Sequence, residues 1–292
     1  MFNRKHGLAV SILFISSVGW GLTWLPVKSI NQMGLDGMHL VFIACASAGL
    51  LLSPILVRQL RFWTGSFRYL LLIGLFGGVA YLTFQISIVY GNVVRVMILF
   101  YLLPVWSVLG GWYILKERPD WLRVLAVIIS LSGAMLILGI DSGTFTGLNW
   151  LDVMAIIAGV TFALNNIMFR KTAAQPIAGK VSVMFLGCAF LTGGYLLLTT
   201  DGATLPNNMS PIYAAGYGVL ILSVVTFGSQ WGVTQLEAGR AALIIVMELV
   251  TAVVSVALLT DIHLSSREII GGLMVLTAAM IEAWHEPEEA MA

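Results

Sequence analysis

The stretch ALIIVMELVTAVVSVALL, residues 242–259, decides how this chain folds. Seventeen of its eighteen residues are uncharged, and Glu248 is the exception. About 20 apolar residues in a helix cross the hydrocarbon of a bilayer, so the stretch predicts a membrane-spanning helix. A charge near the bilayer centre costs at least about 2.5 kcal/mol on insertion scales, and such residues face a cavity or a partner. Glu248 therefore predicts something polar inside the membrane.

The composition of the whole chain agrees with a membrane protein. Of its 292 residues 59% are hydrophobic and 10% are charged, whereas about 25% of residues in a soluble domain are charged. The net charge of +1 argues against a nucleic-acid partner, because phosphate binding needs a concentrated basic surface. Cys45 and Cys188 lie inside apolar runs and are expected to be buried hydrophobes, with no metal or cofactor.

Apolar runs of spanning length recur along the chain and predict an all-α membrane protein with ten transmembrane helices. We place these spans near residues 8–27, 38–57, 69–90, 94–115, 122–140, 150–169, 181–200, 212–235, 240–260 and 267–285. The first run is too long for a cleaved signal peptide and has no small-residue cleavage site after it. The connecting loops are too short to hold a soluble domain, so the function is expected inside the bilayer.

The positions of the basic residues predict the orientation. One side of the membrane holds twelve of them: Arg4, Lys5, Arg58, Arg61, Arg68, Lys116, Arg118, Arg123, Arg170, Lys171, Lys180 and Arg240. The other side holds Lys28, Arg95 and Arg267. Cytoplasmic loops are enriched in Lys and Arg. We therefore expect both termini in the cytoplasm and the chain in the inner (plasma) membrane of a bacterium.

The second half of the chain weakly repeats the first. Shifted by 145 residues, FQISIVYGNVVR (84–95) lies over SQWGVTQLEAGR (229–240), with Gln85 on Gln230. Each half, residues 1–143 and 144–292, then contains five spans. An odd number makes the second repeat enter from the opposite side, and inverted repeats with a midplane substrate site are typical of secondary transporters.

Two motifs carry a resemblance to a known family. They are WGLTWLPVK (20–28) in the first span and LLPVWSVLGGWYILKERPDWLRVLAVIISLSGAMLIL (102–138) over spans four and five. With the ten-span layout, they make the chain similar to the drug/metabolite transporter superfamily, most of all to its EamA-type members. The second repeat departs from that pattern, with Leu249 where Pro is common and TDIHLSSRE (260–268) in place of the Lys-Glu-Arg turn. The resemblance implies transport of amino acids, metabolites or drugs, often outward and often in exchange for protons.

Polar residues at helical spacing predict where the solute binds. Glu248 lies eight residues beyond Arg240, about 12 Å deeper at 1.5 Å per residue, and shares a helix face with Thr251 and Ser255. Similar stripes occur on spans one, three, six and eight. The candidate substrate-binding residues are Trp20, Trp24, Tyr81, Gln85, Asn165, Asn166, Gln230, Thr234, Glu248 and Thr251. Such a pocket suits a small organic solute better than a bare ion.

Several of these residues have a structural alternative. Glu248 could be a protonated acid bonded to a neighbouring helix, and Asn165 and Asn166 could join helices by hydrogen bonds. The GxxxG pairs Gly74/Gly78 and Gly228/Gly232 predict close helix packing. Tryptophans at span ends, Trp63 among them, are expected as anchors at the membrane surface.

The sequence therefore favours a secondary active transporter, an exporter of a small organic metabolite such as an amino acid, with proton coupling through Glu248. The competing hypotheses are an intramembrane enzyme and a non-transporting channel or assembly protein. The enzyme hypothesis lacks an HExxH or GxSxG motif and paired carboxylates, so no enzymatic activity is expected. A channel would show a repeated filter or a charged ring. Substrate identity, direction, coupling ion and oligomeric state are left open.

Overall fold

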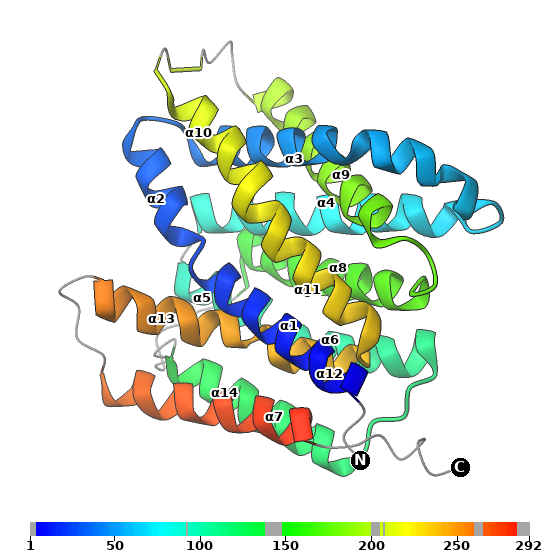
Figure 1. Ribbon diagram of the computed structural model, residues 1–292. Coiled ribbons are helices and arrows are strands. Elements are labelled where there is room, and N and C mark those ends of the chain that lie inside the picture. The colour runs from blue at the N-terminus through cyan, green and yellow to red at the C-terminus, as the bar shows by residue number, and fades with distance from the viewer. Residues whose placement is uncertain are drawn as a thin grey trace.

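The computed structural model describes residues 4–91, 93–137, 148–199, 205–206, 208–259 and 265–284. Within these ranges every regular element is a helix, in agreement with the predicted all-α class (Figure 1). The helices fall into ten stretches, and each stretch coincides with one of the ten expected spans.

The first five stretches are α1 (Arg4–Gly21) with α2 (Trp24–Gln32), α3 (Gly37–Gln59), α4 (Phe67–Tyr90), α5 (Val93–Phe100) with α6 (Leu103–Gly110) and η2 (Gly111–Leu115), and α7 (Trp121–Ile137). A short helix η1 (Leu60–Trp63) follows α3. The last five are α8 (Trp150–Lys171), α9 (Ile177–Thr199), α10 (Ser210–Tyr217) with η3 (Gly218–Leu222) and α11 (Ser223–Gln235), α12 (Ala238–Ile245) with α13 (Met247–Leu259), and α14 (Ser266–Trp284).

Seven helical segments of the described chain are long and apolar enough to cross a membrane. Three more apolar helices are shorter: Leu103–Leu115, Trp121–Leu136 and Ile269–Ile281. They correspond to the expected spans four, five and ten. The chain is thus a multi-pass membrane protein, with seven helices of full spanning length and three shorter ones.

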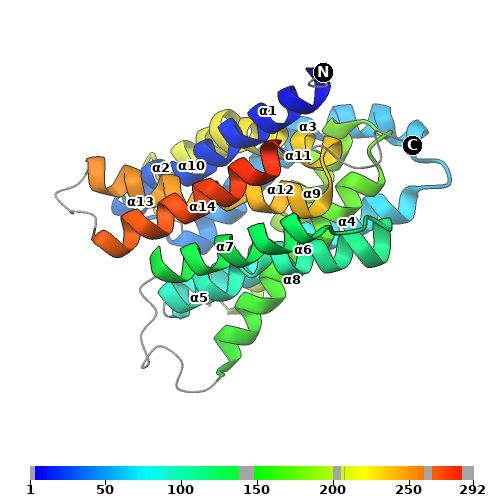
Figure 2. The same cartoon turned by 90° about the horizontal axis from the view of Figure 1, so that it is seen from below.

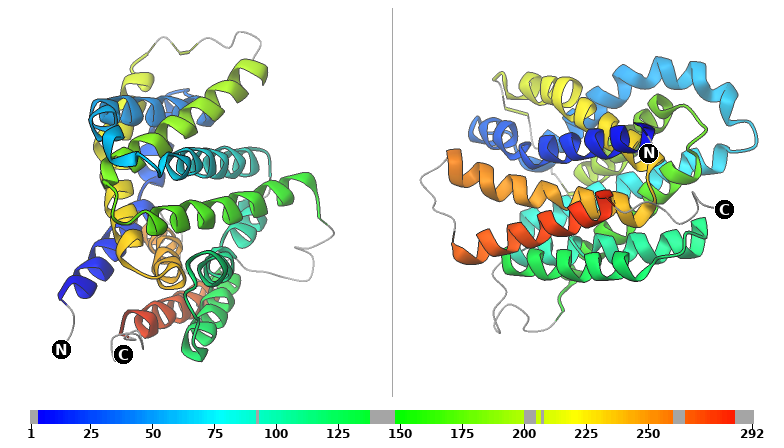
Figure 3. Two further views of the ribbon diagram at one scale, coloured as in Figure 1. Left: turned by 90° about the vertical axis from the view of Figure 1, so that its right-hand side faces the viewer. Right: turned by 60° about the horizontal axis from the view of Figure 1, so that its bottom comes forward.

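Helices from the two halves of the chain pack against each other. The largest contacts are those of α3 with α9, α7 with α14, α4 with α8 and α9, and α1 with α11. Figure 2 shows α7 and α14 running together along one side of the bundle, away from α3. The helix α1 begins and α14 ends at the same end of the bundle (Figure 3). We call this end, where α3 and α8 also finish, the basic end.

Three of the spans are interrupted, and span one breaks at Leu22 and Thr23, between α1 and α2. Span four breaks at Tyr101 and Leu102, and Pro104 lies in the first turn of α6. Span nine breaks at Val246, which lies 145 positions after Tyr101, and no proline stands there. At this break the amide of Leu249 donates to the carbonyl of Val246 at 3.0 Å, a tighter turn than an α-helix. The missing proline therefore does not abolish the break.

Small residues bring the helices close, as the glycine pairs predict. A Cβ on Gly78 would lie 2.6 Å from the carbonyl oxygen of Gly187 on α9. A Cβ on Gly232 would lie 2.7 Å from the Cβ of Leu13 on α1. Neither position leaves room for a side chain, so these glycines set the distance between helices.

Cys45 and Cys188 are free and buried, which confirms the prediction that they lie in the apolar interior. The prediction for Trp63 is wrong. This side chain is 1% exposed and packs in the main hydrophobic core instead of lying at the membrane surface.

Candidate functional site

A cavity of about 510 Å³ lies between helices of both halves of the chain. It reaches the surface at Asn31, an exposed residue near the end of α2, and extends inward to Glu248 on α13. Seven aromatic residues line it: Trp20, Trp24, Tyr81, Phe84, Phe100, Phe162 and Tyr217. Eight polar residues line it: Ser17, Thr23, Asn31, Gln85, Thr226, Ser229, Gln230 and Glu248. The volume is that of a site for a small organic molecule.

Glu248 is held on the cavity wall by one neighbour. The hydroxyl of Tyr101, at the break in span four, donates to Oε1 of Glu248 at 3.0 Å. No described residue bonds the other carboxylate oxygen. Because Glu248 lies in the first turn of α13, directly after the break in span nine, the interrupted spans four and nine meet at this carboxylate. Helix breaks are where transporters place their binding groups.

Aromatic rings line the same cavity as the carboxylate. The ring of Phe100 lies 4.6 Å from that of Phe84 and 5.9 Å from that of Phe162, between ring centres. It also packs edge-on against Tyr101 at 5.5 Å. Aromatic pairs at these separations stabilise one another beyond the area they bury. The cluster therefore gives the cavity a firm apolar wall beside Glu248.

Buried amides and hydroxyls form a second polar group at the cavity wall and directly behind it. The Nε2 of Gln230 donates to Oδ1 of Asn166 at 3.1 Å. Several buried atoms in this region have no partner among the described residues: the hydroxyls of Tyr81 and Thr226, Oε1 of Gln230 and Nδ2 of Asn166. An unpaired buried polar atom is costly, so these atoms are expected to bind water or solute.

The structure separates the ten candidate residues into two groups. Six line the cavity: Trp20, Trp24, Tyr81, Gln85, Gln230 and Glu248. Asn165 and Asn166 lie behind the wall, buried, and Asn165 donates to the sulfur of Met184 at 3.4 Å. The other two do not line it either. The hydroxyl of Thr234 donates to the carbonyl of Trp231, and that of Thr251 to the carbonyl of Met247.

Sequence reasoning missed the partner of Glu248 and the aromatic wall. Tyr101, Phe84, Phe100 and Phe162 look like ordinary apolar residues of their spans. One signal was available, since Pro104 predicts an interruption just before it and Tyr101 lies at that interruption.

Two contacts lie on the Trp24 side of the cavity. The indole nitrogen of Trp24 donates to the hydroxyl of Ser255 on α13 at 2.9 Å, which ties α2 to α13. The ammonium of Lys28, an exposed residue, lies 5.7 Å from the centre of the same indole. One face of Trp24 is therefore already occupied by a cation of the protein itself.

The basic end of the bundle is closed. All eight residues of α12 are buried there. Arg123 of α7 forms an ion pair with Glu237, the residue before α12. Glu117 accepts the amide of Ala238 at 2.9 Å and approaches the guanidinium of Arg170 at 3.5 Å. These contacts join the two halves of the chain at this end.

The turn after η2 brings Glu117 to this position. Lys116 adopts the left-handed conformation, with φ of 64°, and so ends the helix and turns the chain back toward α12. Burial raises the pKa of Glu117 above its ordinary value, while the amide of Ala238 and the charge of Arg170 act in the opposite direction.

Lys180 is a buried residue near the start of α9. It donates to the carbonyls of Phe169 and Thr172 at the end of α8, at 3.2 and 2.8 Å. A cation there satisfies carbonyls that the helix leaves free.

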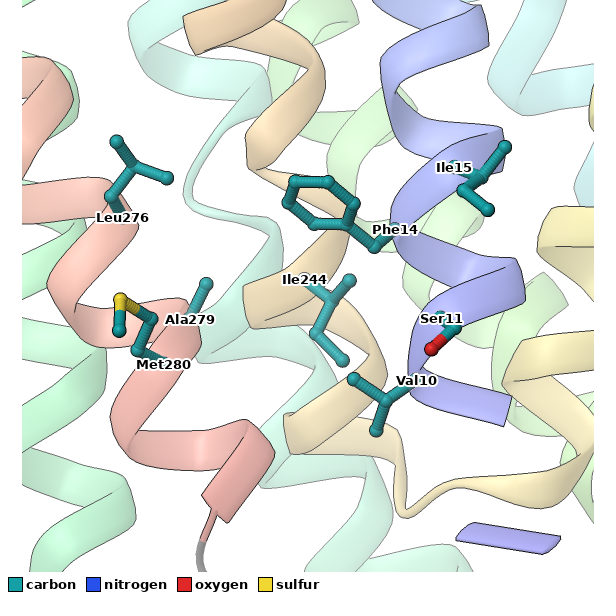
Figure 4. A pocket seen from close by; sticks show the side chains of 8 residues that line it. All are labelled: Val10, Ser11, Phe14, Ile15, Ile244, Leu276, Ala279 and Met280. Atoms are coloured by element: carbon teal, nitrogen blue, oxygen red, sulfur yellow. The ribbon is translucent and has the colours of Figure 1, made fainter. Parts of the chain in front are cut away.

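A second hollow, of about 300 Å³, differs from the central cavity. Figure 4 shows Val10 and Phe14 of α1 facing Ile244 of α12, with Leu276 and Met280 of α14 on the other side. Its lining is apolar except for Ser11, and Phe14 and Met280 are 40% and 46% exposed. Such an apolar, exposed groove suits contact with lipid, so the central cavity is the candidate site.

The ion pair between Arg123 and Glu237 is expected to couple α7 to α12. Removing one partner leaves the other charge poorly compensated, whereas removing both does not. We expect Arg123→Met and Glu237→Gln each to lower the thermal unfolding midpoint, and the double variant to lower it by less than the sum. The coupling expected from such neighbours is about 0.5–3 kcal/mol. If the two single decreases in the unfolding midpoint add up in the double variant, the ion pair does not stabilise the contact of α7 with α12.

The described helices form an apolar bundle around a partly polar cavity that reaches the surface near Asn31. Residues 7–139 match the model of the EamA-like transporter family, which confirms the resemblance stated from the sequence. A solved structure described only as "Crystal structure of protein" aligns with a TM-score of 0.73 and 15% identity, over 94% of this chain and 96% of that one. That likeness shows the fold alone. No match is found among the curated proteins.

Proposed function

We propose that the chain is a secondary active transporter that exports a small organic metabolite, an amino acid or a similar solute, by alternating access. In this proposal the solute binds in the central cavity and Glu248 carries the coupling proton. The observation that carries the proposal is the cavity itself: it extends to a carboxylate deep in the bundle, and all eight residues of α12 toward the basic end are buried.

The two halves, residues 1–143 and 144–292, are proposed to be inverted repeats. Three features support this. The breaks in spans four and nine lie 145 positions apart, which is the offset of the sequence self-match. If the halves are repeats, span three is equivalent to span eight and span six to span one. The contact of α4 (span three) with α8 (span six) then has its counterpart in the contact of α11 (span eight) with α1 (span one). The pairs α3 with α9 and α7 with α14 join equivalent spans of the two halves.

Inverted repeats give one chain two related open states. In the state described here the cavity opens near Asn31. For the opposite state the contacts of Glu117, Arg123 and Glu237 at the basic end would separate, and matching contacts would close the other end. In this proposal Glu248 is reached from one side in each state, and Tyr101 and Tyr81 are the titratable neighbours that face it. A carboxylate so placed could exchange its proton with either side in turn.

The excess of basic residues at one end supports a cytoplasmic position for that end and for both termini. The inner membrane of a bacterium is the proposed location. With protons more abundant outside, exchange of an entering proton for a leaving solute gives export.

Transport itself is the test of this function. The purified protein is reconstituted into lipid vesicles, and a labelled amino acid or amine is supplied with an imposed proton gradient. We expect uptake against the solute gradient that collapses when a protonophore is added. Downhill flux that ignores the protonophore would favour a channel, and chemical conversion of the solute an intramembrane enzyme. No flux of any solute in a broad panel would favour an assembly protein.

A further inference from the structure

The charges around the central cavity are unbalanced. Among the described residues that line the cavity, Glu248 is the one acidic residue, and none is Lys, Arg or His. Lys28 does not line the cavity; it lies over the indole of Trp24 and is exposed. Its charge is therefore screened by solvent over about 8 Å at physiological ionic strength.

The apolar part of the cavity has a matching preference. The rings of Phe84, Phe100 and Phe162 form one cluster beside Glu248. The ring of Trp20 lies 6.2 Å from that of Tyr81 in the same cavity. Ring faces attract cations, and Trp and Tyr do so most strongly. Aromatic faces around a carboxylate are the chemistry by which proteins recognise ammonium groups.

We propose, on the basis of the function proposed above, that the solute is an organic amine with an aromatic or apolar body and without a carboxylate. The ammonium group bonds to the free oxygen of Glu248, and the body lies against the aromatic cluster. The unpaired oxygen of Gln230 and the hydroxyl of Tyr81 offer further hydrogen bonds to polar groups on that body.

An amino acid fits this cavity less well. Its carboxylate would enter a partly apolar site beside Glu248, with no described cationic side chain on the wall to bind it. A buried anion without a partner is strongly disfavoured, and two carboxylates repel each other. Within the proposed class of metabolites, amines are therefore favoured over zwitterionic amino acids and over organic acids.

Four solutes with the same ring separate these possibilities: phenethylamine, phenylethanol, phenylalanine and phenylpropionate. Binding to the full-length protein in detergent is measured by thermal shift and by calorimetry, with no need for transport. A charge-assisted bond to Glu248 should make phenethylamine bind about tenfold to a hundredfold more tightly than phenylethanol. Phenylalanine and phenylpropionate should bind more weakly than phenylethanol.

The variant Glu248→Gln provides the control, since it keeps the size of the side chain and the acceptor for Tyr101. It should remove the advantage of phenethylamine over phenylethanol, while phenylethanol still binds. A misfolded variant would lose both ligands, so the neutral ligand reports on folding. Equal binding of amine and alcohol, or preferred binding of phenylalanine, would overturn the amine proposal. Proton-driven transport of some other solute would then leave the general function standing.

Discussion

The variant Glu248→Gln is expected to abolish proton-driven accumulation of the solute in vesicles, down to the level of vesicles without protein. Gln has the shape of Glu but carries no exchangeable acidic proton. Its side-chain oxygen can still accept from the hydroxyl of Tyr101, so the local structure should persist. Uptake is measured with an imposed proton gradient and across a pH series. Wild-type uptake should depend on pH, and the residual uptake of the variant should not.

A second carboxylate makes the comparison specific. Glu117 is also partly buried, but it lies at the basic end and does not line the cavity. In Glu117→Gln the side-chain oxygen can still accept the amide of Ala238, so the fold should be kept. This control should keep the dependence of uptake on pH, even where its weaker contact with Arg170 changes the rate. Undiminished uptake by Glu248→Gln over the whole pH series would remove Glu248 from the coupling mechanism.

The architecture was largely predictable because lipid imposes a simple length rule on the chain. Each of the ten apolar runs became a helical stretch, since backbone groups without water must bond within the helix. Glycine pairs such as Gly74/Gly78 predicted close packing for a similarly local reason. The exception was Trp63, whose indole was expected at the membrane surface. Its neighbours in the core come from other helices, and no spacing along its own helix reveals them.

The candidate site was predictable only in part. A polar residue in an apolar helix is conspicuous, so Glu248, Gln85 and Gln230 could be found from the sequence, and all three line the cavity. Thr234 and Thr251 share their helix faces but bond to their own backbone. Threonine has this local option in any helix, whereas a long carboxylate or amide must look further for partners. Helical spacing alone does not distinguish the two cases.

The aromatic wall could not be found by the same reasoning. Phe84, Phe100 and Phe162 come from three different helices, and nothing in a phenylalanine within an apolar run shows whether it faces lipid, core or cavity. Their meeting depends on how α4, α5 and α8 cross, which is a property of the packed bundle. Tyr101 could be predicted in part. Pro104 indicates the helix break at which Tyr101 lies, but it does not show that the Tyr101 hydroxyl contacts Glu248.

How tightly the bundle must pack can be tested at one position. A Cβ on Gly187 of α9 would lie 2.1 Å from the carbonyl oxygen of Gly74 on α4, and the other nearest atoms are also backbone of Gly74. No side chain there can rotate away, so α4 and α9 would have to separate. Overpacking of a core typically costs about 1–3 kcal/mol, and a clash with rigid backbone belongs at or above the upper end. We therefore expect Gly187→Ala to lose most of its folded protein, measured as the monodisperse fraction and thermal midpoint in detergent.

Gly194 is the matched control, because it lies on the same helix and a Cβ there meets nothing within 4 Å. Gly194→Ala should fold like the wild type or gain up to about 1 kcal/mol from the better helix propensity of alanine. The two variants make the same chemical change about two helical turns apart. A difference between them therefore reports the contact of α9 with α4 and not the substitution itself. If both variants fold equally well, the helices are not held at the separation described, and the cavity between them loses its rigid frame.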